Sequence, residues 1–182
     1  MDQMSKETNQ INLDINLVKT LMPDASPNDL NHFMYICIEY NLDPLKKEIY
    51  AIRHGNKYIA VTSRDGYLKI ANLNPEFDGL ESDVVYQGDK LVKNENGSIT
   101  MEYGESHMMF DKPKLSGAFC SVFRKDRSKA TTIFVSIKDY YKKTQIWDQY
   151  TNAMILKVAE SMALKRAFSI SGLTSKEEID NE

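Results

Sequence analysis

The feature that most constrains the fold is an apolar helical face in the last part of the chain, between about Asp148 and Phe168. At about 100° per residue, with Lys157 set at zero, the apolar side chains fall in one arc from about 60° to about 240°. An arc this wide belongs in a protein interior, so we expect a long C-terminal core helix. The side chains that form the arc are Met154, Val158, Met162, Ile155, Ala159 and Ala163.

Two cations interrupt this apolar face. Lys165 falls at about 80° and Arg166 at about 180°, where an unpaired buried charge would cost several kcal/mol. In one interpretation the end of the helix reaches solvent, where cations suit the negative end of the helix dipole and long side chains reach water. In the other, Lys165 and Arg166 line a groove that holds an anionic backbone, and we favour this groove.

The net charge of −3 argues against a nucleic-acid partner, but the charges are segregated along the chain. Residues 112–166 hold twelve Lys and Arg against four Asp and Glu, whereas residues 1–111 hold ten against eighteen. A basic segment of this kind is often only a solvated, salt-bridged face. It is also the composition that binds phosphates, which need clustered Lys and Arg.

The densest cations of the basic segment surround one predicted turn, and Lys142 and Lys143 follow a short helix later. Aromatic side chains are interleaved with them, a combination that lets a protein follow a phosphate backbone while stacking on bases. Core packing is the alternative explanation for these aromatics. The cations of the turn are Arg124, Lys125, Arg127 and Lys129, and the aromatics are Tyr140, Tyr141 and Trp147.

The pattern along the chain predicts the α+β class: a mostly antiparallel sheet with β-hairpins packed on helices. Ser26 and Pro27 are typical of a helix start, and Gly55-Asn56 is typical of a hairpin turn. We expect a flexible segment over 1–13, one domain over 14–175 and an acidic tail over 176–182. The predicted helices are 14–21, 26–40, 64–72, 137–143 and 148–168; the predicted hairpins are 48–53 with 58–62, Val84–Tyr86 with Ile99–Met101, and 115–124 with 131–137.

No catalytic constellation is recognisable. His32, His54 and His107 are scattered and no two have the spacing of a zinc site, while no Walker-type loop or Gly-x-Ser-x-Gly elbow occurs. Cys37 and Cys120 match no metal or redox spacing and are expected to be buried thiols. We therefore predict a protein that is not an enzyme and needs no metal or cofactor. Without an apolar run of membrane-spanning length, it is expected in the cytoplasm.

Four segments together resemble the phage recombination protein Bet family of RecT-type single-strand annealing proteins. The first is Tyr40-Asn41-Leu42-Asp43-Pro44 followed by Lys47-Glu48-Ile49-Tyr50-Ala51, and the second is Asp65-Gly66-Tyr67 with Ile70 and Asn72. The third is the basic turn Arg124-Lys125-Asp126-Arg127, and the fourth is the closing helix Met154 to Phe168. The resemblance covers most of residues 28–175.

The resemblance implies an ATP-independent protein that coats single-stranded DNA exposed by a phage 5′→3′ exonuclease and anneals it to a complement. It implies homo-oligomeric rings or helical filaments, in the cytoplasm of a bacterial host that supplies a single-strand-binding protein. By position, Lys125, Lys143 and Lys165 match the DNA-contacting cations of the family. The placement of charge along the chain, not the resemblance, adds Arg124, Arg127, Lys142 and Arg166 to the expected DNA site, which also includes Lys157. The residues expected at the groove or a subunit contact are Arg64, Asp65, Tyr67, Lys69, Tyr141 and Trp147.

Two departures from the family pattern bear on this hypothesis. An acidic hairpin is expected over about 87–114, facing away from the DNA, and the link from Lys143 to Trp147 is short. The chain ends at Glu182, so the C-terminal domain that recruits partners in this family is expected to be absent. The alternatives left open are a passive single-strand coat or assembly scaffold and, less favoured, a metal-dependent nuclease.

Overall fold

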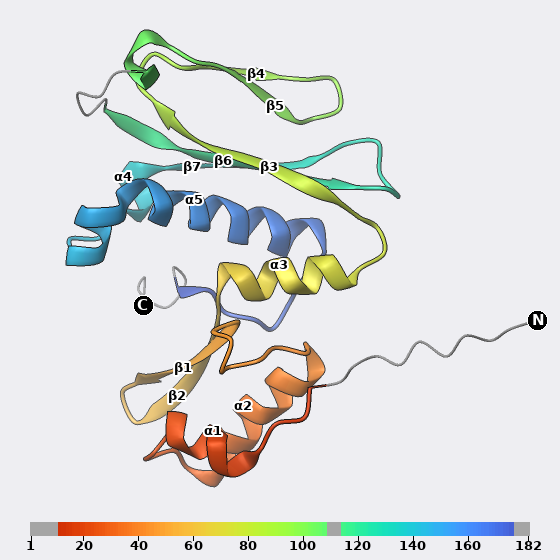
Figure 1. Ribbon diagram of the computed structural model, residues 1–182, viewed down its shortest axis with the longest axis vertical. Coiled ribbons are helices and arrows are strands. Elements are labelled where there is room, and N and C mark those ends of the chain that lie inside the picture. Colours follow the sequence, from red (N-terminus) through yellow and green to blue (C-terminus); the bar gives the residue numbers. More distant parts are fainter. Residues whose placement is uncertain (1–10, 109–113, 177–182) are drawn as a thin grey trace, which may run out of the picture.

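The computed structural model describes residues 11–108 and 114–176 and has two parts, one above the other in Figure 1. The helices are α1 (Ile15–Leu21), α2 (Pro27–Glu39), α3 (Arg64–Leu73), α4 (Ile137–Tyr140) and α5 (Gln145–Ala167), with a 3-10 turn, η1, at Glu105–Met108. The strands are β1 (Ile49–His54), β2 (Lys57–Thr62), β3 (Phe77–Tyr86), β4 (Lys90–Lys93), β5 (Ile99–Glu102), β6 (Leu115–Arg124) and β7 (Thr131–Ser136). The lower part contains α1, α2 and a hairpin; the upper part contains a three-stranded sheet, a second hairpin and the helices α3, α4 and α5.

The lower part is built by the local signals that its sequence carries. Ser26 caps α2 in a reciprocal arrangement: its hydroxyl accepts the amide of Asp29 at 3.2 Å, and the Asp29 carboxylate accepts the amide of Ser26 at 3.3 Å. Phe33 and Cys37 lie on the face of α2 that is buried in the core. The hairpin β1–β2 is antiparallel across the Gly55 turn, as predicted.

The upper part is built around an antiparallel sheet with helices packed on one face. The sheet has the order β3-β6-β7 and is antiparallel throughout, and α5 runs beneath it in Figure 1. Ala118 and Cys120 of β6 share the hydrophobic core with Ile155 and Ala159 of α5, all of them fully buried. Ile155, Val158, Ala159 and Ala163 of the apolar arc are buried, which confirms the predicted C-terminal core helix, whereas Met162 of the same arc is 36% exposed.

One predicted pairing is wrong. Val84–Tyr86 does not form a hairpin with Ile99–Met101: these residues end β3, which pairs with β6 through contacts such as Val84 with Ala118. The partner of β5 is β4, because the tight turn between Asn94 and Gly97 brings together the strands that directly flank it.

The hairpin β4–β5 lies on the opposite side of the sheet from α5 (Figure 1). The amide of Ile99 donates to the Ser121 hydroxyl, and Thr132 donates to the Gly97 carbonyl. At its base the buried Asp89 carboxylate accepts the amide of Gly104 and contacts Nδ1 of His107, each at 2.8 Å. The hairpin is thus held against the sheet, and residues 109–113 of the predicted 87–114 segment lie outside the described residues.

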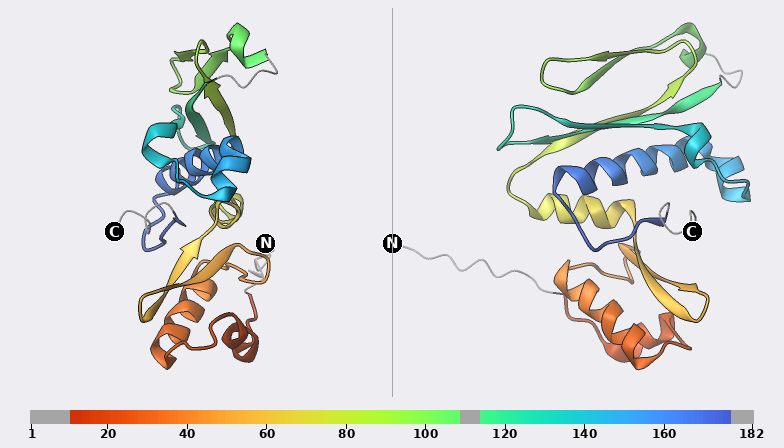
Figure 2. Two further views of the ribbon diagram at one scale, coloured as in Figure 1. Left: turned by 90° about the vertical axis from the view of Figure 1, so that its left-hand side faces the viewer. Right: turned by 180° about the vertical axis from the view of Figure 1, so that it is seen from behind.

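The C-terminal segment joins the two parts of the molecule. After α5 the chain turns back toward the lower part, as the view from behind in Figure 2 shows. Thr174 pairs in parallel with Val61, and its carbonyl accepts the amide of Thr62 at 2.8 Å. A single cluster of buried side chains runs from Val18 in α1 to Leu173, so the core is continuous between the parts.

The α+β class with antiparallel sheets is confirmed, although the strands form three separate sheets. Helix ends differ slightly: α4 stops at Tyr140 instead of continuing to Lys143, and α5 begins at Gln145. The segments expected to be loose lie mostly outside the described residues, at 1–10 and 177–182.

Candidate nucleic-acid interface

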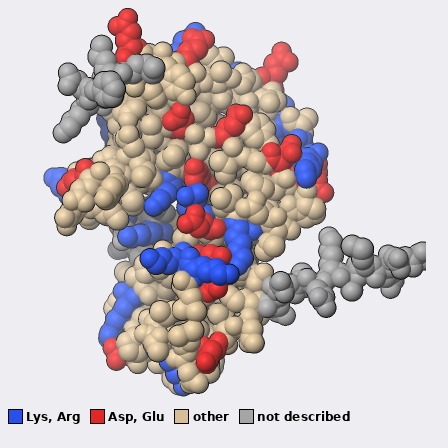
Figure 3. Space-filling model, viewed as in Figure 1, with Lys and Arg blue, Asp and Glu red and all other residues tan. Residues whose placement is uncertain are grey.

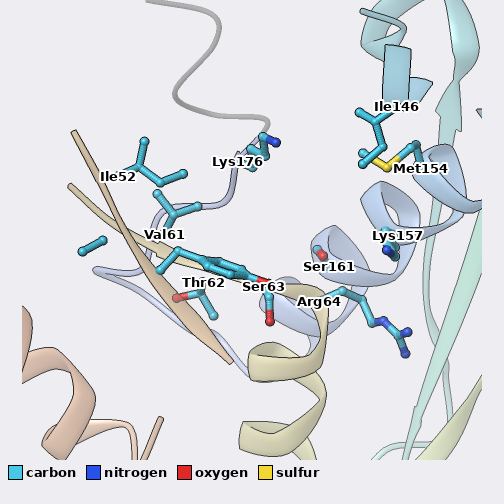
Figure 4. A pocket seen from close by; sticks show the side chains of 12 residues that line it. Ile52, Val61, Thr62, Ser63, Arg64, Ile146, Met154, Lys157, Ser161 and Lys176 are labelled. Carbon is cyan, nitrogen blue, oxygen red and sulfur yellow. The ribbon is translucent and has the colours of Figure 1, made fainter. Parts of the chain in front are cut away.

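A cleft of about 380 Å³ lies where the β1–β2 hairpin, the start of α3 and one face of α5 meet. Figure 4 shows Ile52 and Val61 from the hairpin on one side, with Ile146, Met154 and Lys157 of α5 on the other. We call it the central cleft. Its lining residues are Tyr50, Ala51, Ile52, Val61, Thr62, Ser63, Arg64, Ile146, Met154, Lys157, Ser161 and Lys176.

The position of α3 at this cleft depends on a close backbone contact. The carbonyl of Glu48 accepts both the amide and the hydroxyl of Ser63, at 3.0 and 3.1 Å. A Cβ on Gly66 would lie 2.2 Å from the same carbonyl, so only glycine fits there. Ser63 also caps α3 by accepting the amide of Gly66.

The carboxylate of Glu48 stabilises the same region through contacts with two other residues. It accepts the amide of Asp43 and Nζ of Lys69, both at 2.7 Å. Lys69 is thus engaged in a partly buried ion pair, which stabilises the fold. Of the segments Tyr40–Ala51 and Asp65–Tyr67, only Tyr50 and Ala51 line the cleft, while Glu48 and Gly66 hold α3 against the hairpin.

Three cations line the central cleft: Arg64, Lys157 and Lys176. Figure 3 shows Lys and Arg atoms gathered, with some carboxylates, in the hollow between the two parts of the molecule. Lys157 and Lys176 are exposed, and no hydrogen bond or ion pair engages their side chains within residues 11–108 and 114–176. These two charges are therefore available to an anionic partner.

Arg64 differs because an acidic neighbour holds it. Its Nε lies 3.3 Å from Oε2 of Glu160 and 3.2 Å from Oδ1 of Asp65. The Glu160 side chain is only 11% exposed, and its other oxygen accepts the Ser82 hydroxyl at 2.7 Å. Arg64 thus links α3, α5 and β3 at the edge of the cleft.

The basic turn between β6 and β7 lies elsewhere, beside the C-terminal end of α5. Arg124 makes two short bonds to Asp126, at 2.8 and 2.7 Å, and donates to the carbonyl of Ala167 at 3.0 Å. Its guanidinium also covers the ring of Phe168 at 4.9 Å. The hydrogen bond with Asp126 raises the pKa of Arg124 and lowers the pKa of Asp126.

The other cations of this turn are less tightly held. Lys125 donates to the carbonyl of Pro75 at 3.1 Å and remains exposed, as do Arg127 and Lys129. Lys165, partly buried, and Arg166, exposed, lie next to the turn because Arg124 contacts the end of α5. The first explanation offered for these helix cations applies in part, since Arg166 reaches solvent where the helix ends; the groove for an anionic backbone stays a prediction.

Lys142 and Lys143 lie at the opposite end of α5, in its link to α4. The helix is interrupted by non-helical backbone at Tyr150, and its regular stretch from there to Ala167 spans roughly 25 Å, so the predicted cations do not form one compact patch. Lys157 lies between the two groups, about 12 Å along the axis from Lys165. Tyr141 is near Lys142, 41% exposed, and donates to the Asp148 carboxylate, which raises the pKa of Tyr141.

Two aromatic predictions need correction. Tyr67 is 0% exposed and Trp147 is 4% exposed, so neither side chain lines a groove or meets another subunit. Tyr67 sits in the core with its hydroxyl 3.5 Å from the carbonyl of Leu173. Both are large apolar surfaces that the core buries, the alternative weighed for the basic-segment aromatics. Asp65 is exposed and contacts Arg64.

The sequence interpretation missed two features of the cleft. Tyr50 is 41% exposed beside the fully buried Ile49, so strand alternation was the signal that places it on the solvent side. Lys176 was assigned to an acidic tail without a role, yet it lines the cleft because the chain turns back along β2. No local sequence pattern predicts that the chain after α5 turns back to β2.

A metal site, a reactive cysteine and a membrane helix each have requirements that the described residues do not meet. No group of three or more potential metal ligands occurs in the described part of the chain. Cys37 and Cys120 are buried, as predicted, and burial raises the pKa of each thiol to about 12. Among the described helices, none is long and apolar enough to cross a membrane.

Comparison with known proteins agrees with the resemblance seen in the motifs. The sequence matches the profile of the RecT family over residues 3–182. It is also similar to the recombination protein bet of Escherichia phage lambda, with 23% identity over 180 residues, covering 90% of this chain. The match spans 58% of the length of the lambda protein.

Proposed function

Because the chain belongs to the RecT family, we propose that it binds single-stranded DNA in the central cleft and promotes pairing with a complementary strand. The observation that carries this proposal is the cleft itself, where Lys157 and Lys176 have no partner among the described residues. Together with Arg64 they face an apolar wall. This pairing of cations with apolar side chains suits a strand whose backbone is charged and whose bases are not.

Annealing follows from neutralising one strand. Cations on the phosphates reduce the repulsion between two strands, while phosphate contacts leave the base edges free to pair with a complement. The second strand then reads the sequence, and no covalent bond changes. We accordingly propose a protein that is not an enzyme, and that works without ATP or another cofactor.

The DNA path that we propose follows α5. Lys157 and Arg64 form its centre; Lys142 and Lys143 extend it at the start of the helix. Lys165 and Arg166, with Lys125 and Arg127 of the basic turn, extend it at the other end. Arg124 supports this end chiefly by holding the turn against α5.

Such a path, longer than one cleft, suits a strand shared by neighbouring subunits. We propose that the protein forms a homo-oligomer, a ring or helical filament, on DNA in the cytoplasm of a bacterial host. By the same family relationship, a phage 5′→3′ exonuclease would supply the single strand, and the host single-strand-binding protein would be a second partner.

A single assay tests this function. Complementary fluorescent oligonucleotides are mixed with the protein in the absence of ATP, with and without magnesium, and both pairing and strand length are followed. We expect faster pairing with intact strands. Binding without acceleration would instead indicate a passive coat, and magnesium-dependent shortening would indicate a nuclease. Light scattering with long oligonucleotides tests assembly: a chain that stays monomeric would contradict the filament.

A further inference from the structure

The buried carboxylate of Glu160 lies behind the central cleft. Glu160 is 8% exposed, and burying a carboxylate is costly unless it is paired and hydrogen-bonded. Here it has one partner of each kind: the Ser82 hydroxyl at 2.7 Å and Nε of Arg64 at 3.3 Å. Both of its oxygens are therefore engaged, from β3 on one side and α3 on the other.

Arg64 is contacted only along one edge. Its contacts with Glu160 and Asp65 are both made by Nε, which is buried and lies within ion-pair distance of each carboxylate but donates a hydrogen bond to neither among the described residues. Among residues 11–108 and 114–176, no hydrogen bond or ion pair engages Nη1 or Nη2. Figure 4 shows the side chain reaching from the start of α3 along α5, on the side of the cleft where Lys157 lies. The terminal nitrogens thus remain as two parallel donors.

We infer that Glu160 is a positioning residue: it holds Arg64 by the Nε edge, so that Nη1 and Nη2 bind one phosphate of the DNA backbone as a pair. The planar guanidinium matches two phosphate oxygens, a geometry that a lysine cannot reproduce. A guanidinium held in advance also loses less side-chain freedom on binding. This inference rests on the proposed function, because it names the group that a bound strand would present to Arg64.

The direction in which one substitution changes DNA affinity shows whether Glu160 positions Arg64 or acts only through its negative charge. Glu160→Gln keeps the size of the side chain and an oxygen for Ser82 but removes the negative charge. If Glu160 acted only as a nearby negative charge, its removal would strengthen the binding of a phosphate. If it positions Arg64, its removal weakens binding even though the cleft becomes more positive.

The test measures binding of a labelled single-stranded oligonucleotide over a series of salt concentrations, with unfolding midpoints measured in parallel. We expect Arg64→Ala to weaken binding about tenfold, the loss of a charge-assisted pair of hydrogen bonds, and to make the salt slope shallower by about 0.7. Arg64→Lys should restore the slope but only part of the affinity. Glu160→Gln should weaken binding about threefold, well within the loss caused by Arg64→Ala.

The double variant shows whether Glu160 acts through Arg64. In the Arg64→Ala background, Glu160→Gln should cause no further loss of affinity. Lys93→Ala, at an exposed cation of β4 outside the cleft, is the matched control for a removed charge. An equal loss from Glu160→Gln in both backgrounds, or a gain of affinity in the single variant, would overturn the positioning role.

The two proposals fail in different ways. A wild-type protein that does not bind the oligonucleotide at low salt overturns the proposed function and this inference with it. A wild-type protein that binds, while Arg64→Ala binds equally well with an unchanged slope, overturns only the inference.

Discussion

The central cleft and the β6–β7 turn are both rich in cations, but they use them differently. In the turn, the strongest contacts of Arg124 are internal: Asp126, the end of α5 and the ring of Phe168. In the cleft, Lys157 and Lys176 have no partner within the described residues. Arg127 and Lys129 of the turn are also exposed, without a hydrogen bond or ion pair of their side chains within the described residues, so what distinguishes the cations of the cleft is that they face an apolar wall. The number of basic residues in a segment therefore does not give the number of cations that can bind a ligand, because internal ion pairs and hydrogen bonds engage some of them.

The strongest test of this comparison reverses the charges of the cleft. Lys157→Glu combined with Lys176→Glu should weaken binding of single-stranded DNA on the order of a hundredfold, because two attractions become repulsions. Fluorescence anisotropy with a labelled oligonucleotide measures the change. Lys19→Glu combined with Lys93→Glu, at exposed positions outside the cleft, makes the same change in net charge. Equal losses from the two double variants would show that only net charge matters.

Removing Arg124 should instead affect stability. Arg124→Ala is expected to lower the free energy of unfolding by about 2 kcal/mol, because it loses charge-assisted hydrogen bonds and leaves the Ala167 carbonyl without this donor. Urea denaturation measures the loss. Arg127→Ala, in the same turn but exposed, should change stability little. If the Arg124→Ala variant is as stable as the wild type and its DNA binding has a clearly shallower salt slope, Arg124 contacts DNA. The turn and the central cleft would then use their cations in the same way.

Lys125 of the turn and Lys165 at the end of α5 should have a smaller, measurable role in DNA binding. Lys125→Ala combined with Lys165→Ala should weaken DNA binding about fivefold for all sequences alike and slow annealing, since phosphate contacts carry no sequence information. Binding to oligonucleotides of different sequence, together with annealing rates, checks this. If annealing is unchanged, the DNA path does not extend to the turn.

The pH dependence of stability gives the smallest expected effect. The Arg124 guanidinium lowers the pKa of Asp126 below its ordinary value of 3.8. A lowered pKa in the folded state means stability that is present above pH 3.8 and lost as the pH falls through the lower, folded value. Between about pH 5 and about pH 3, unfolding midpoints of the wild type should therefore fall more than those of Asp126→Asn. Parallel curves would show that this pair contributes nothing to folding.

Much of the local structure was predictable because its causes are local. Ser26 and Pro27 mark the start of α2, and the spacing of apolar residues placed α5 against a sheet. The β3–β6 pairing was not predictable in this way, because Val84 and Ala118 meet across a loop that contains another hairpin. For the site, Lys157 and Arg64 were named as candidates, but nothing in their local sequence shows that they share one cleft.

The sequence by itself determined the helix caps, the turns, the apolar face of α5 and the family, since each depends on residues close together or on ordered motifs. Only the tertiary structure decided which aromatics are buried, as Tyr67 and Trp147 are, and which cations keep a free charge. Arg124 meets Ala167 across 43 residues, and Arg64 meets Glu160 across a longer stretch. Coulombic pairing depends on distance in space, so the available charge of a basic segment is known only once the chain has folded.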